Sequence, residues 1–272
     1  MLIFDNLINL ICSKRQEIKI NINSNNISEF IPKIYYIGDG KTGSASIKNG
    51  FPDVNVAHWH TTQYFEQIYN TKLLSYNNLD LYDLIIYIGN KFNFKPIIIE
   101  SIRNPIELGI SRIFQHIKKD REHKTECKMC NIKKIKKVKR IIPLIKDIIL
   151  CHEKNNKCYS ISMYKKHFDI DLISNFNLKQ DYYFNNTKKC YLLLLKFENI
   201  INWETIINNC LQYKFILKHT NKTKNIKYKK VKKNIKFSRD VFKLLYDREE
   251  IACFYSNNEI NKIKEKYIKK TI

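Results

Sequence analysis

Apolar residues along this chain gather in short continuous runs, which are separated by segments with a helical pattern. The run Pro96-Ile97-Ile98-Ile99 is apolar at every position, which is typical of a strand covered on both faces in a parallel sheet. Strands are predicted near residues 33–38, 54–58, 96–102 and 191–198. Helices are predicted between them, near residues 43–50, 62–69, 80–91 and 104–118.

Local signals mark where several helices begin or break. Asn104 followed by Pro105 is a strong helix start, because asparagine caps a helix and proline suits its first position. Pro143 should kink or restart a helix expected over 132–153. Further helices are predicted at 203–212, after the capping residue Ser238, and as a basic amphipathic helix over 259–270.

Together these elements predict an α/β protein, built as a P-loop-like parallel sheet flanked by helices. Right-handed crossovers should bring the loops that follow the strands to one edge of the sheet. We expect a single domain over residues 33–268, preceded by an N-terminal extension at 1–32. A helical, basic insertion is expected within it at 119–160.

Two of these loops carry residues suited to binding anions. The loop Lys41-Thr42-Gly43-Ser44-Ala45-Ser46 follows a buried strand and opens a helix, so small residues, a helix N-terminus and a lysine could cradle an oxyanion. An ordinary turn made of small residues is the alternative. Sixty residues on, the strand that ends at Ile102 leads into Arg103, and Ser111 follows on a helix. Two such anion-binding segments indicate a ligand with two phosphate-like groups.

Charge and composition narrow the class of protein. The 272 residues carry a net charge of +23, which favours polyanionic partners, and 44% hydrophobic residues exclude a disordered chain. Lysine dominates residues 118–140 and 214–236, although solvated surface lysines and the coding bias of an AT-rich genome explain much of this. The first twelve residues lack the features of a signal peptide, and no long uncharged apolar window occurs. We therefore expect a cytoplasmic protein with no membrane span.

The Lys41 loop also matches part of a nucleoside-triphosphate P-loop. Gly40-Lys41-Thr42 fits the end of that motif, but Tyr35 stands where its first glycine belongs. Glu100 and Glu198 are the acids that could hold Mg²⁺. A metal-dependent kinase or NTPase is therefore the second hypothesis.

In order and spacing, these residues resemble sulfotransferases that use 3′-phosphoadenosine 5′-phosphosulfate (PAPS). The Lys41–Ser46 loop is similar to their 5′-phosphosulfate motif, and Arg103-Asn104-Pro105 with Ser111 to their 3′-phosphate motif. His58-Trp59-His60 ahead of this element resembles the H-x-H and strand-R-D-P order of uronyl 2-O-sulfotransferases. The second half is similar to the related capsular-polysaccharide synthesis proteins at 168–171, 194–199 and 254–260. The resemblance spans roughly residues 33–268, although Asn104 replaces the usual aspartate and Lys196 a common arginine.

The resemblance implies a site and a reaction. Lys41, Thr42, Gly43, Ser44, Ala45 and Ser46 would hold the 5′-phosphosulfate of PAPS, and Arg103 and Ser111 its 3′-phosphate. The sulfuryl group would pass to a hydroxyl acceptor such as a carbohydrate, with no metal. Lys41 would stabilise the leaving phosphate, and His58 or His60 would act as the base, His60 being favoured.

Eight cysteines allow one further hypothesis. Cys127-x-x-Cys130, with Cys151 and Cys158 downstream, could form a structural zinc site, and His123 could join the first pair. Only one half of the site has the usual spacing, so reduced thiols are favoured. A non-enzymatic, basic nucleic-acid-binding protein is the remaining alternative function.

Overall fold

The computed structural model describes most of the chain as two compact units. Unit 1 comprises Met1–Ile102 and Tyr182–Thr220, and unit 2 comprises Arg103–Asp181 and Asn221–Ile272. The chain therefore passes between the units three times. The residues described are 2–18, 31–38, 43–59, 65–66, 69–119, 138–155, 159–218, 226–247 and 249–268.

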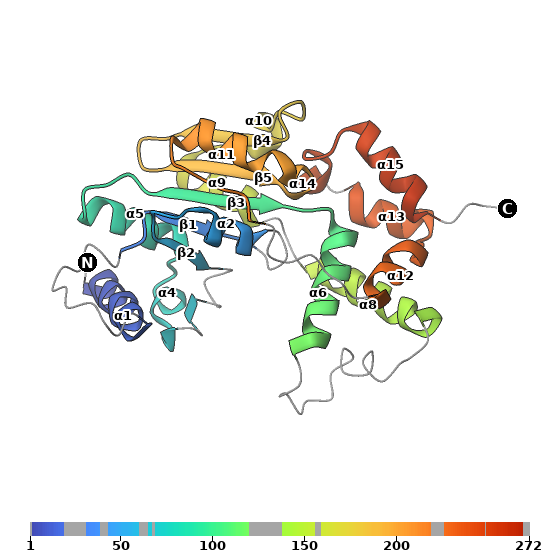
Figure 1. The fold of residues 1–272 in the computed structure, drawn as a ribbon, viewed down its shortest axis with the longest axis horizontal. Helices are drawn as coiled ribbons and strands as arrows, with labels where there is room; N and C mark the ends of the chain where they lie inside the picture. The colour runs from blue at the N-terminus through green and yellow to red at the C-terminus, as the bar shows by residue number, and fades with distance from the viewer. Residues whose placement is uncertain are drawn as a thin grey trace. The chain divides into compact units, whose positions relative to one another are not determined.

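Unit 1 is built on a five-stranded sheet with the order β2-β1-β3-β5-β4 (Figure 1). Four strands are parallel, and β4 pairs antiparallel with β5 at one edge. The strands are β1 (Ile34–Ile37), β2 (Val56–Trp59), β3 (Ile97–Ile102), β4 (Tyr182–Asn186) and β5 (Tyr191–Lys196). This confirms an α/β fold with a mostly parallel sheet flanked by helices. The edge strand β4 was not predicted.

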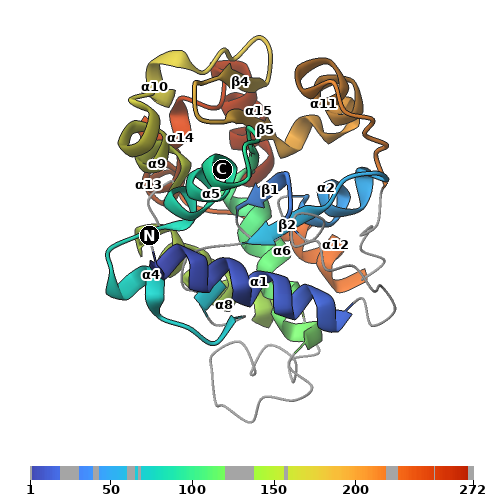
Figure 2. The ribbon, with the colours of Figure 1, turned by 90° about the vertical axis from the view of Figure 1, so that its left-hand side faces the viewer.

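Helices cover both faces of this sheet. On one face, buried side chains of β1, β3 and β5 pack with those of α2 (Ser44–Gly50) and α11 (Trp203–Leu211). On the other face, Tyr82 of α5 (Leu81–Lys91) donates a hydrogen bond to the buried Glu100 of β3. Figure 2 shows α2 and α11 on one side of the sheet and α5 on the other. Burial on both sides explains why the strands β1, β3 and β5 consist mainly of apolar residues.

Three further helical segments belong to the described part of unit 1. In α1 (Leu2–Ile18), Phe4 stacks on Tyr87 of α5 at 4.7 Å between ring centroids, and Asp5 pairs with Lys91. Leu7 and Ile11 are fully buried, so the predicted N-terminal extension adds to the core of this unit. The other two segments are α4 (Leu73–Tyr76) and the 3₁₀ helix η2 (Phe197–Asn202).

Unit 2 is helical in its described part. Its core consists of isoleucines from α6 and α8 with aromatic and aliphatic side chains from α12, α13 and α15. Its helices are α6 (Pro105–Lys119), α8 (Val138–Asn155), α9 (Tyr159–Phe168), α10 (Leu172–Asn175), α12 (Ile226–Asn234), α13 (Arg239–Tyr246), α14 (Glu249–Ala252) and α15 (Asn257–Tyr267).

Most predicted helices are found, with one difference in detail. The α8 helix continues through Pro143 and does not restart there. Proline removes one backbone hydrogen bond, whereas Ile141, Ile145 and Ile149 on the same helix are all buried, and their burial outweighs that loss. The helix predicted at 62–69 falls largely outside the described residues.

The predicted helix starts are confirmed where the structure describes them. Asn104 accepts a hydrogen bond from the Glu107 backbone at 3.2 Å, and α6 begins at Pro105. Ser238 accepts one from the Val241 backbone at 3.4 Å at the start of α13. Within the described ranges, no helix combines the length and the apolar character needed to cross a lipid bilayer.

Candidate functional site

The strand order places a topological switch point at the carboxyl end of β1. From β1 the chain crosses to β2 on one side through α2, and β3 lies on the other side of β1. The chain leaves β1 toward β2, whereas the next strand that pairs with β3 is β5 on the opposite side, so the connections that follow β1 and β3 diverge there. In open α/β sheets, ligands bind at such a point. The predicted anion-binding loop at 41–46 follows β1 at this edge.

Gly43 fixes the start of α2. Its φ of 99° lies in the left-handed region, which favours glycine. A Cβ atom on Gly43 would lie 2.4 Å from the Trp203 ring, so a larger residue would collide with that buried side chain. Two features therefore require glycine at this position: the left-handed backbone conformation and the close approach of the Trp203 ring.

The Trp203 ring packs against the turn at Gly43. It is fully buried at the start of α11, and its indole N–H donates a 3.1 Å hydrogen bond to the Lys196 carbonyl at the end of β5. Phe197 meets its ring edge-on at 6.1 Å between centroids. The end of β5 and the start of α2 are thus linked through one tryptophan.

The first turn of α2 carries the remaining described residues of the loop. Ser44 and Ala45 are half-buried, whereas Ser46 is 7% exposed. The Ser46 backbone N–H donates to the Gly43 carbonyl at 2.9 Å, and its hydroxyl donates to the Lys218 carbonyl at 3.0 Å. Ser46 therefore ties α2 to the segment after α11. Lys41 and Thr42 lie outside the described residues.

His58 lies in β2, on the face of the sheet that α2 covers. It is paired in register with Tyr36 of β1, and the two rings meet edge-on at 5.4 Å between centroids. The Tyr36 and Ser101 hydroxyls are hydrogen-bonded, which extends this polar row to β3. His60, the favoured base, lies outside the described residues.

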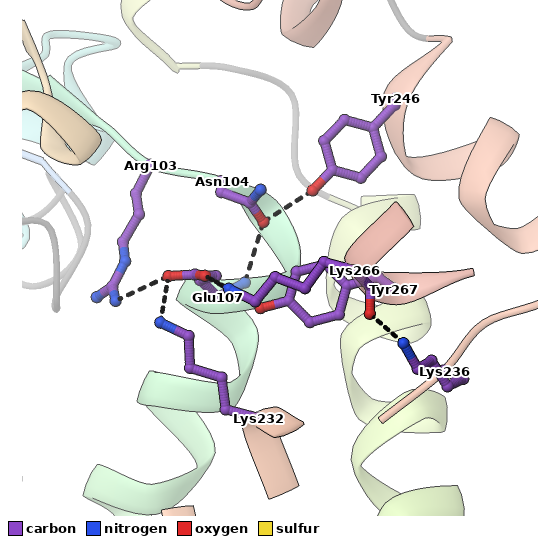
Figure 3. A network of polar contacts seen from close by, with 8 residues as sticks. All are labelled: Arg103, Asn104, Glu107, Lys232, Lys236, Tyr246, Lys266 and Tyr267. Atoms are coloured by element: carbon purple, nitrogen blue, oxygen red, sulfur yellow. Dashed lines mark hydrogen bonds and ion pairs between the residues drawn. The ribbon is translucent and has the colours of Figure 1, made fainter. Parts of the chain in front are cut away.

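Arg103 begins unit 2, immediately after β3, and lies in a network of charged side chains (Figure 3). Its guanidinium is 3.8 Å from the Glu107 carboxylate, and its side chain is 8% exposed. The same carboxylate accepts hydrogen bonds from Lys232 of α12 at 2.8 Å, Lys266 of α15 at 2.7 Å and the Tyr267 hydroxyl at 3.0 Å. Three cationic side chains thus surround the carboxylate of Glu107.

The electrostatics of Glu107 follow from these neighbours. Burial acts to raise the pKa of its carboxyl, but the hydrogen bonds from Lys232 and Lys266 outweigh burial and lower the pKa from 4.5 to about 2. Burial and the nearby Glu107 raise the pKa of the Tyr267 hydroxyl. Glu107 is therefore ionised at neutral pH and neutralises one of the three positive charges, so this cluster is suited to an oxyanion.

Asn104 and Ser111 lie on either side of Glu107 in the sequence. The Asn104 side-chain oxygen caps α6 and also accepts a 2.7 Å hydrogen bond from the Tyr246 hydroxyl. Ser111 is half-buried in α6. The Lys41 loop and Arg103 belong to different units, so their binding of one shared ligand stays a prediction.

The acids and cysteines of the alternative hypotheses are placed as follows. Glu100 is buried on the face of the sheet that α5 covers, hydrogen-bonded by Tyr82, and Glu198 is exposed in η2. For the zinc hypothesis, Cys151 lies in α8, although its side chain is not among those described. The other cysteines of that hypothesis, and His123, lie outside the described residues: Cys127, Cys130 and Cys158.

Three features of these sites could not be identified from the sequence pattern. Trp203 is typical of a buried helix start, and Lys232 and Lys266 of solvated lysines. Glu107 stands three residues after the capping residue Asn104. A glutamate at this position usually accepts a hydrogen bond from the backbone of the capping residue. Its convergence with two distant lysines depends on tertiary packing, so no local signal reveals it.

Comparisons with known proteins returned no match, whether the chain was compared with protein-family models, with curated proteins or with solved structures.

Proposed function

We propose that this protein is a sulfotransferase, which transfers a sulfuryl group from PAPS to a hydroxyl acceptor such as a carbohydrate. The observation that carries the proposal is the turn at Gly43. It opens a helix at the carboxyl edge of β1, beside a topological switch point, in the conformation and close packing that only glycine allows.

The residues after β3 supply the second support. Arg103 follows this strand directly and lies in a cluster where three cations share one carboxylate. A phosphate monoester carries up to two negative charges at neutral pH, so it would balance the remaining positive charge. This suits the role proposed for Arg103, together with Ser111 of α6, in binding the 3′-phosphate.

In the proposed reaction, the acceptor oxygen forms a bond to sulfur while the bond from sulfur to the 5′-phosphate oxygen breaks. The leaving group is adenosine 3′,5′-bisphosphate, whose developing charge Lys41 and the start of α2 stabilise. The proton of the acceptor hydroxyl passes to His60 or His58, which contributes about 10² to 10⁴ in rate. Positioning of the two oxygens in line supplies much of the remainder.

Ligand binding and transfer together test the proposal. The purified protein should bind adenosine 3′,5′-bisphosphate at micromolar concentrations, and Arg103→Ala should weaken binding. Transfer of label from ³⁵S-PAPS to candidate glycans should be lost in Lys41→Ala. Failure to bind the bisphosphate would count against the proposal, and Mg²⁺-dependent ATP binding in its place would favour the kinase hypothesis.

A further inference from the structure

The positive charge of the chain is concentrated in unit 2. The residues of unit 2 include 35 Lys and Arg against 15 Asp and Glu, a balance of +20, whereas unit 1 has 14 against 11, a balance of +3. The two units alternate along one chain and contain similar numbers of residues, so a coding bias toward lysine would act on both. The unequal distribution therefore needs another cause, such as a polyanionic partner of unit 2.

Among the helices that the structure describes, α12 carries the highest density of this charge. Its nine residues include five lysines and no acid. Val231 is buried and Lys232 turns to Glu107, while Lys229, Lys230 and Lys233 are exposed. Like charges so close together repel one another, and a bound polyanion would relieve that repulsion.

The Glu107 cluster holds a second basic helix beside this one. Lys232 of α12 and Lys266 of α15 bind the two oxygens of the same carboxylate on α6, as Figure 3 shows. Lys262 and Lys264 of α15 are exposed. The two helices are thus fixed on a common support. We call their exposed side next to this carboxylate the α12–α15 face, and its members are Lys229, Lys230 and Lys233 of α12 and Lys262 of α15, which lies one turn before Lys266.

The aromatic residues of these two helices indicate the kind of polyanion. Tyr228 is half-buried and meets Phe114 edge-on at 5.6 Å between centroids, and Tyr267 is buried. Neither helix therefore exposes a ring on which an unpaired base could stack, as single-stranded nucleic acid requires. A duplex keeps its bases stacked inside and presents phosphates outside, so lysines on rigid helices suffice to bind it.

We propose that the α12–α15 face binds double-stranded nucleic acid through its phosphates, without reading its sequence. This function is separate from sulfuryl transfer and needs neither Lys41 nor Arg103. It accounts for the density of lysine on α12 and for the lack of exposed rings on α12 and α15.

The test is the binding of a short labelled DNA duplex, followed by fluorescence anisotropy across a series of salt concentrations and without nucleotide. Lys229, Lys230 and Lys233 are replaced together by glutamine. We expect the slope of log Kobs against log salt to become shallower by about 2 to 3, and affinity at about 0.1 M salt to fall at least tenfold.

The control removes the same charge from unit 1, by replacing the exposed Lys72, Lys188 and Lys189 with glutamine. It should retain most of the affinity and the slope. Equal losses in both variants, an unchanged slope in the α12 variant, or tighter binding of the single strand than of the duplex would each overturn the proposal. So would binding of a heparin fragment of equal charge without binding of the duplex. Affinity for adenosine 3′,5′-bisphosphate, measured separately, reports on the sulfotransferase proposal alone.

Discussion

At the scale of single residues, Gly43 and Glu107 each satisfy several constraints at once. Gly43 combines a left-handed backbone with contact against Trp203, and Glu107 combines partial burial with three cationic neighbours. Neither residue can be replaced by a similar one without a cost in free energy, and the size of that cost can be estimated from the contacts.

Replacing Gly43 by alanine should destabilise the protein by about 2 to 5 kcal/mol. A left-handed residue with a Cβ costs about 1 to 2 kcal/mol, and the collision with Trp203 adds about 1 to 3 kcal/mol. Urea unfolding of Gly43→Ala, Trp203→Phe and the double variant separates the two costs. The alanine should cost less in the Trp203→Phe background, and equal costs in both backgrounds would mean that the collision is relieved elsewhere.

Glu107→Gln should lower the free energy of unfolding at pH 7 and should make that free energy depend less on pH in the acid range. Because the folded-state pKa is depressed, ionised Glu107 stabilises the fold above its unfolded pKa of 4.5, and this contribution is lost as the pH falls toward 2. The difference between the unfolded-state and folded-state pKa of Glu107 corresponds to about 3 kcal/mol of stability. Unfolding free energies of both proteins, measured between these limits, should converge at the acid end. Glu265→Gln, which removes an exposed carboxyl of α15, should leave the pH profile close to that of the wild type.

At the scale of elements, helix starts explain several of the short motifs. Asp171 caps α10 by accepting a hydrogen bond from the Ile173 backbone at 3.0 Å. Ser256 and Glu259 form a reciprocal capping box at the start of α15. These residues belong to the stretches that resemble capsular-polysaccharide synthesis proteins, so this part of the resemblance concerns how helices begin.

Asn104→Ala should destabilise α6 by about 2 kcal/mol. The change removes the cap of this helix, worth about 0.5 to 2 kcal/mol, and the acceptor of the Tyr246 hydroxyl. Asn104→Asp keeps an oxygen for both donors and should unfold close to the wild-type midpoint. Thermal unfolding followed by circular dichroism distinguishes the three proteins, and an alanine variant as stable as the aspartate variant would contradict this account.

How much of the fold could be predicted depended on the strength of each local signal. The strands β1, β3 and β5 are mainly apolar, so they were identified almost to their bounds, whereas the half-exposed edge strand β4, Tyr182–Asn186, lacks a distinct period. The candidate site was predicted in a similar way. Gly43 and Arg103 stand beside strand ends, but their partners Trp203 and Glu107 are set by packing between segments far apart in the sequence.

At the scale of the whole molecule, the uneven charge should make stability depend on salt. Raising NaCl from about 10 to 300 mM shortens the Debye length severalfold and screens the repulsion among the cations of unit 2. We expect Tm to rise by about 2 to 4 °C, equivalent to about 1 kcal/mol. The variant that lacks Lys229, Lys230 and Lys233 should show a smaller rise. A Tm that falls with salt would indicate that favourable ion pairs dominate instead.

The pairing of β3 with β5 has a consequence for synthesis on the ribosome. Ile97 pairs with Tyr191, so one side of a mainly apolar strand has no neighbour until some ninety further residues have been translated. At about 5 to 20 residues per second, this interval lasts roughly 5 to 20 seconds. During that time the nascent chain exposes an aggregation-prone edge, so yields should improve when translation is accompanied by chaperones that shield such edges.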